Sequence, residues 1–146
     1  MLFRSPVTWA PTDVVPPDPD RWVEGRLVEA LDGDVPDLVV GKSLGTRAAS
    51  WAAARRWPAV WVTPLLRDDA CLAGVCANPA PQLLVCGLAD PLHDASAAAR
   101  LPCEVLELPG VDHALSSTGD GVVAPDILAR VADATADFVA GLRRLA

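Results

Sequence analysis

The stretch DLVVGKSLGTRAAS, residues 37–50, decides how the chain is interpreted, because it joins an apolar run to an alanine-rich segment through glycines and a serine. Two motifs overlap in it. Gly41-Lys42-Ser43 matches the end of a nucleotide-binding P-loop. Gly41 to Gly45 matches G-x-S-x-G, the sharp turn that presents a serine between a strand and a helix.

A P-loop requires G-x-x-x-x-G-K-[ST], but Pro36 stands where its first glycine belongs. The apolar run also continues directly into Gly41, so a strand occupies the place of the loop. The serine turn needs the order found here, with Ser43 in a strained backbone conformation. It also needs Gly41 and Gly45 at the point where strand and helix approach. The sequence favours the serine turn, and an ordinary strand–helix turn with an N-cap serine is the alternative.

The length and composition of the chain indicate a single α/β domain over residues 1–146, with 51% hydrophobic and 21% charged residues. Its apolar runs are too short to cross a membrane, and its N-terminus lacks a secretory signal, so we expect a cytoplasmic protein. A net charge of −7 argues against nucleic acid as a partner. The four cysteines form no C-x-x-C pair and both histidines lie far from a cysteine cluster, so we expect no metal. No G-x-G-x-x-G follows any expected strand, and we expect no cofactor.

The order of the elements predicts a parallel sheet between helices. Three central runs, LVV, AVWV and LLVC, are apolar without alternation, as in strands that are covered on both faces. The expected strands are Pro6–Trp9, Asp37–Val40, Ala59–Thr63, Gln82–Cys86 and Glu104–Leu108. Helices are expected after an Asp18 cap, over Ser43–Trp57, and around Ile127 to Leu142, while Arg67–Pro81 suits a short helix or a proline-rich loop. This predicts a three-layer α/β/α sandwich with a mostly parallel sheet of about five strands, which binds ligands beyond the carboxyl ends of the strands.

Two further expected strands are each followed by a side chain that can take part in acid–base chemistry. The strand QLLVCGLAD ends in Asp90, and the strand EVLELPGVDH leads into a loop with His113. With the GKSLGT turn and a long final helix, the chain resembles the α/β-hydrolase family, specifically its small, lidless members. The resemblance implies that Ser43 is a nucleophile, that His113 is its base and that Asp90 orients the imidazole.

The resemblance also implies the surroundings of the serine. The Leu44 N–H is expected to donate to an oxyanion, Lys42 to add positive potential, and Trp9 and Thr63 to line the pocket. Asp94 is the rival acid. His93, three residues after Asp90, is expected to face solvent at a helix start.

The family pattern contains about three strands before the region matched here, and the loop after the third supplies a second oxyanion donor. The sequence has no His-Gly dipeptide of the kind found in that loop, so we expect a truncated α/β-hydrolase fold. Two functions follow: an esterase- or thioesterase-like serine hydrolase acting on a small ester-like substrate, or a non-catalytic module for binding or scaffolding. Without the third strand, either the first strand pairs beside Asp37–Val40 or that edge is bare, and a bare edge favours a homodimer.

Overall fold

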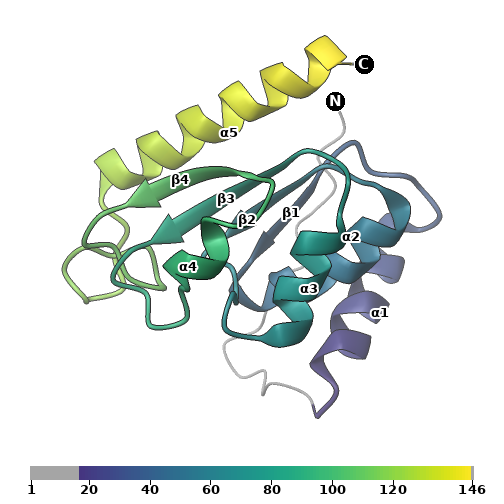
Figure 1. Ribbon diagram of the computed structural model, residues 1–146, viewed down its shortest axis with the longest axis horizontal. Coiled ribbons are helices and arrows are strands. Elements are labelled where there is room, and N and C mark those ends of the chain that lie inside the picture. The colour runs from purple at the N-terminus through teal and green to yellow at the C-terminus, as the bar shows by residue number, and fades with distance from the viewer. Residues whose placement is uncertain (1–16, 146) are drawn as a thin grey trace.

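The computed structural model describes residues 17–145, which form a four-stranded sheet between two helical layers (Figure 1). The strands follow the order β1-β2-β3-β4, and each pairs in parallel with the next. They are β1 (Val39–Lys42), β2 (Ala59–Val62), β3 (Gln82–Gly87) and β4 (Glu104–Leu108). This confirms the expected α/β class and parallel sheet, while the predicted strand Pro6–Trp9 lies outside the described residues.

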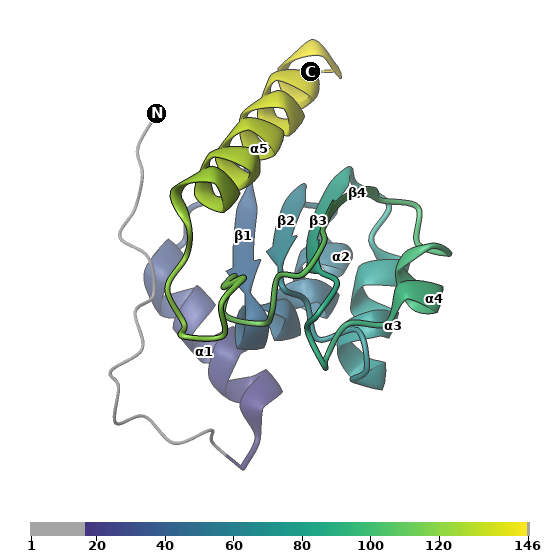
Figure 2. The same cartoon turned by 90° about the vertical axis from the view of Figure 1, so that its left-hand side faces the viewer.

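The helices divide between the two faces of the sheet. One face is covered by α1 (Pro19–Leu31), η1 (Ser43–Ala48), α2 (Ala49–Arg55), α3 (Asp69–Ala77) and α4 (Ala95–Ala98). The opposite face is covered by α5 (Pro125–Leu145), as Figures 1 and 2 show. Each connection from one strand to the next therefore passes over the face that carries α1 to α4, as right-handed parallel crossovers require.

Two apolar cores, one on each face, hold these layers together. Buried side chains toward α1 to α4 include Val39, Ala49, Trp61, Val75 and Leu84. Those toward α5 include Val60, Val85, Leu108, Ile127 and Phe138. The inner strand β3 is buried along its whole length, which explains the continuous apolar run LLVC within it.

Some helix and strand boundaries differ from those expected from the sequence. The first described strand runs two residues later than expected, because its pairing with β2 extends from Val39 opposite Ala59 to Lys42 opposite Val62. The segment expected to be one helix begins as the 3₁₀ helix η1. The ambiguous region contains α3, whose N-terminus is capped by the Asp68 carboxylate.

Among residues 17–145, none of the helices combines the length and the hydrophobicity that a membrane-spanning segment needs. In the same residues no group of three or more acidic, histidine or cysteine side chains is placed to hold a metal ion.

Candidate active site

Ser43 lies at a sharp turn where β1 ends and η1 begins. Its backbone has a φ of 50°, in the left-handed region that non-glycine residues rarely adopt. The buried Thr46 hydroxyl donates a hydrogen bond of 2.7 Å to the Ser43 carbonyl and so closes the turn. The structure thus has the strand, sharp turn and helix order that the sequence predicts for this serine.

The two glycines of the turn differ in what they allow. A Cβ on Gly41 would lie 2.8 Å from the Gly45 carbonyl oxygen and 2.8 Å from Cζ3 of Trp61. Because carbon atoms pack best at about 3.5–4.0 Å, position 41 has no room for a side chain. A Cβ on Gly45 would meet no heavy atom of the described residues within 4 Å. The expected steric reason for glycine therefore holds at position 41, and at position 45 it is wrong.

The structure brings Ser43, His113 and Asp90 into one chain of hydrogen bonds. The Oγ atom of Ser43 lies 2.6 Å from Nε2 of His113. Nδ1 of His113 lies 2.7 Å from Oδ2 of Asp90. An ionised carboxylate only accepts, so Nδ1 of a neutral imidazole carries the proton and donates it to Asp90. Nε2 is then free to accept from the serine hydroxyl.

Exposure differs along this chain of side chains. The Asp90 side chain is 1% exposed, whereas that of His113 is 30% exposed. The buried carboxylate also accepts a hydrogen bond of 2.8 Å from the Leu92 N–H through its other oxygen. Asp90 is therefore fixed from two sides, and the imidazole lies between it and the solvent-accessible face.

The loops that carry the acid and the histidine are joined through their backbones. The Ala89 N–H donates to the Val111 carbonyl at 3.0 Å, and Gly87 leaves room for the backbone at 111 and 112 to approach. Asp112 accepts from the Ala114 and Ser116 N–H groups at 2.9 and 2.8 Å. As expected, Asp112 contributes hydrogen bonds to its own loop.

Lys42 and Thr63 lie beside this arrangement. The Lys42 ammonium donates to the backbone carbonyl of His113 at 3.0 Å and to Oγ1 of Thr63 at 3.4 Å. Burial lowers the pKa of Lys42 from its ordinary value, while the nearby carboxylates of Asp90 and Asp112 act to raise it. The lysine thus ties the end of β1 to the histidine loop.

Two further expected residues concern the oxyanion and the pocket. Leu44 is the second residue of η1, so its N–H precedes the first hydrogen bond within that helix. This leaves the N–H available at the helix N-terminus, as an oxyanion donor would need to be. Trp9 lies outside the described residues.

The residues that follow Asp90 have other roles. The Asp94 carboxylate accepts from the Ala97 N–H at 2.8 Å and caps α4, so the structure does not place this rival acid at His113. His93 is only 9% exposed, and the expectation that it faces solvent is wrong. Neither of its ring nitrogens has a hydrogen-bond partner among residues 17–145. Packing of the segment between β3 and α4, which the sequence pattern does not reveal, buries this ring.

Sequence reasoning missed two supporting contacts. The Thr46 hydroxyl bonds to the Ser43 carbonyl three residues earlier, so the threonine at this spacing in the sequence could have indicated the contact. The Lys42 bond to the His113 carbonyl joins residues 71 positions apart. No local sequence pattern predicts a contact between residues so far apart in the chain.

Comparison with solved structures finds chains of similar fold. An alpha-beta serine hydrolase homologue from Coxiella burnetii superposes with a TM-score of 0.50 at 19% identity, over 64% of this chain and 48% of that chain. The esterase domain of a Rhodothermus marinus protein superposes with a TM-score of 0.48 at 17% identity, over 67% of this chain and 62% of that chain. This chain thus spans about half the length of the first. No protein-family model and no curated protein matches it. The likeness to the first structure shows the fold: a parallel sheet and helices consistent with part of an α/β-hydrolase fold.

Proposed function

We propose that this chain is a serine hydrolase that cleaves a small ester or thioester, with Ser43, His113 and Asp90 as its catalytic residues. The observation that carries the proposal is the unbroken chain of hydrogen bonds, 2.6 Å and then 2.7 Å, from the serine hydroxyl to a buried carboxylate. The three side chains follow three different strands and meet at one edge of the sheet. An ordinary strand–helix turn would not require an imidazole on its serine.

Acylation follows from this geometry. Nε2 of His113 takes the proton of Ser43 as Oγ bonds to the substrate carbonyl carbon, and the carbonyl oxygen becomes an oxyanion. The Leu44 N–H donates to that oxyanion, and Asp90 stabilises the imidazolium. When the oxyanion collapses, the bond to the leaving alkoxide or thiolate breaks and His113 supplies its proton. The product of this half-reaction is an acyl ester of Ser43.

Deacylation repeats the same steps with water. His113 takes a proton from water as its oxygen bonds to the acyl carbon, and returns that proton to Oγ of Ser43 when the acid leaves. The Lys42 bond to the His113 carbonyl holds the histidine loop against the end of β1 throughout. Its role in the proposal is to position His113.

Labelling with a fluorophosphonate tests the proposal. We expect stoichiometric labelling of the folded chain, none for Ser43→Ala, and labelling slowed about 10⁴-fold for Asp90→Asn and at least as much for His113→Ala. Ser50→Ala removes an exposed serine of α2 and serves as the matched control, with unchanged labelling. Labelling of the folded wild type no faster than that of Ser43→Ala would favour the alternative, a non-catalytic module of the same fold.

A further inference from the structure

His113 lies in the loop between β4 and α5, outside any helix or strand. Its Nε2 lies 2.6 Å from Oγ of Ser43, and its Nδ1 lies 2.7 Å from Oδ2 of Asp90. A displacement of the ring by about 1 Å would take either contact past the ordinary limit of a hydrogen bond, about 3.2 Å. The backbone at residue 113 must therefore be held more closely than that.

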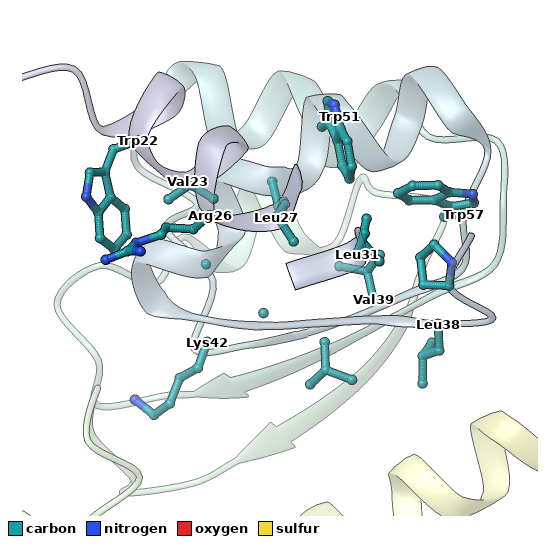
Figure 3. A pocket seen from close by; sticks show the side chains of 15 residues that line it. Trp22, Val23, Arg26, Leu27, Leu31, Leu38, Val39, Lys42, Trp51 and Trp57 are labelled. Atoms are coloured by element: carbon teal, nitrogen blue, oxygen red, sulfur yellow. The ribbon is translucent and has the colours of Figure 1, made fainter. Parts of the chain in front are cut away.

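One restraint on this loop acts at the carbonyl group of His113. Lys42 lies at one end of a groove of about 420 Å³ between β1 and α1, and its side chain extends away from Trp51 and Trp57 of that groove (Figure 3). The Lys42 ammonium donates to the His113 carbonyl at 3.0 Å. A single hydrogen bond fixes one atom of the loop but not the orientation of the residue, so a second restraint is needed.

The carboxylate of Asp112 supplies the second restraint. Its Oδ1 atom accepts from the Ala114 N–H at 2.9 Å and from the Ser116 N–H at 2.8 Å. The Asp112 N–H donates to the Ser116 carbonyl at 2.9 Å, and the Leu115 N–H donates to the Asp112 carbonyl at 3.1 Å. These bonds join the residue before His113 to the three residues after it, so they enclose His113 in one closed turn.

The shape of this turn depends on the side chain at position 112. Leu115 has a φ of 68°, in the left-handed region that non-glycine residues rarely adopt. Such a conformation persists only where the surrounding contacts hold it. Leu115 and Ser116 are both buried, so the turn cannot open without exposing them. An aspartate is suited to holding it, because its short side chain readily accepts from the N–H two residues later.

We propose that Asp112 is a positioning residue, which sets the backbone of this turn so that the His113 imidazole reaches Ser43 and Asp90 at once. The inference rests on the proposed function, in which His113 is the base. Asp112 acts through the backbone on both sides of His113 and touches neither the substrate nor the reacting atoms. Together with the Lys42 bond to the His113 carbonyl, it fixes both the place and the orientation of the histidine.

The rival explanation is that the charge of Asp112 matters rather than its hydrogen bonds. Two substitutions separate the two. Asp112→Asn removes the charge and keeps an oxygen in the same place, which can still accept from both N–H groups. Asp112→Glu keeps the charge but moves the carboxylate outward by a methylene group, so its oxygens no longer match the turn. Asp120→Glu is the matched control in the same loop, where Asp120 accepts from the Ser116 hydroxyl at 3.0 Å and from the Val122 N–H at 2.8 Å.

Two measurements on the full chain test the proposal: the rate of fluorophosphonate labelling at Ser43, and the low-field proton resonance of the His113 Nδ1–H that is donated to Asp90. Misplacing a reacting group by about 1 Å can slow a reaction by about a hundredfold. We therefore expect Asp112→Glu to slow labelling by about tenfold to a hundredfold and to move the resonance upfield. Asp112→Asn should retain the wild-type rate to within about threefold, as should Asp120→Glu, and both should keep the resonance in place. Urea unfolding verifies that each variant is folded.

Several results would overturn the proposal. Slow labelling of Asp112→Asn beside normal labelling of Asp112→Glu would assign the effect to charge. Equal slowing by Asp120→Glu would show that any change in the loop acts alike. Reduced stability of Asp112→Glu with an unchanged rate and resonance would make Asp112 a purely structural residue, and a wild type without the resonance would also contradict the proposal. Because the resonance needs no turnover, a wild type that shows it but is not labelled would contradict the proposed function alone, and the resonances of the variants would still decide the role of Asp112.

Discussion

The turn at Ser43 makes a sharp prediction about its two glycines. Replacing Gly41 by alanine places a Cβ 2.8 Å from the Gly45 carbonyl oxygen and 2.8 Å from Cζ3 of Trp61. Both contacts are about 1 Å shorter than the best carbon packing distance. The Trp61 side chain is fully buried and its Nε1 donates to the Gln82 side chain at 2.8 Å, so the indole cannot swing away. The strand and the turn must therefore separate.

Overpacking of this kind costs about 1–3 kcal/mol, and two rigid contacts argue for the upper end. We expect Gly41→Ala to lower the free energy of unfolding by about 3 kcal/mol. For a chain of this size that corresponds to a fall in Tm of about 10 °C. The same separation displaces Ser43 from His113, so fluorophosphonate labelling should slow as well.

Gly45→Ala is the matched control, because its Cβ meets no heavy atom of the described chain within 4 Å. We expect a change of less than about 1 kcal/mol, of the size of the helix propensity difference between the two residues. Urea unfolding followed by tryptophan fluorescence measures both variants. A Gly41→Ala protein as stable as the wild type, or a Gly45→Ala protein as destabilised as Gly41→Ala, would refute the steric account of the turn.

Three further predictions concern thiols, acid and the lysine beside the site. Burial raises the pKa of Cys71 and of Cys86 to about 12, so iodoacetamide at pH 8 should alkylate the exposed Cys76 first; peptide mapping that finds Cys71 or Cys86 modified before it would contradict this. Burial acts to raise the pKa of Asp68, but a hydrogen bond from the Cys71 N–H and the charge of Arg47 lower it below its ordinary 3.8. The stability that Asp68 contributes is thus present above about pH 4 and lost as pH falls through the lowered pKa. Between pH 4 and 2 the free energy of unfolding should therefore fall less steeply for Asp68→Asn than for the wild type. An unchanged pH dependence would count against the ion pair between Asp68 and Arg47. Lys42→Met should slow fluorophosphonate labelling by about tenfold through loss of its bond to the His113 carbonyl, with Lys42→Arg recovering part of the rate; equal rates for Met and Arg would deny this positioning role.

The fold could be predicted from sequence because its signals are local. The continuous apolar runs that became β2 and β3 indicate strands covered on both faces, and the structure has them so. The boundaries of β1 could not be predicted, because pairing with β2 decides where that strand begins. Helix α3 was ambiguous because its signals compete with the prolines that follow. Close packing of Gly74 on Ala49 of α2 and the Asp68 cap favour the helix there.

The candidate site could be predicted in part for the same reason. The order of Ser43, Asp90 and His113 along the chain, each after a strand, indicates which residues meet at the carboxyl edge of a parallel sheet. The surroundings of these residues depend on tertiary contacts. The burial of His93 and the Lys42 bond to the histidine loop come from segments that approach only once the sheet has formed. The open space at Gly45 likewise has no counterpart in the motif.

The central claim is that Ser43 carries an acyl group during turnover, and rapid mixing with a small activated ester followed by intact-mass measurement tests it most directly. The account predicts a transient gain of one acyl mass, mapped to Ser43, that decays as acid is released. Ser43→Ala and His113→Ala should show no such species. A folded wild-type chain that never gains the acyl mass, or gains it on another residue, would contradict the account.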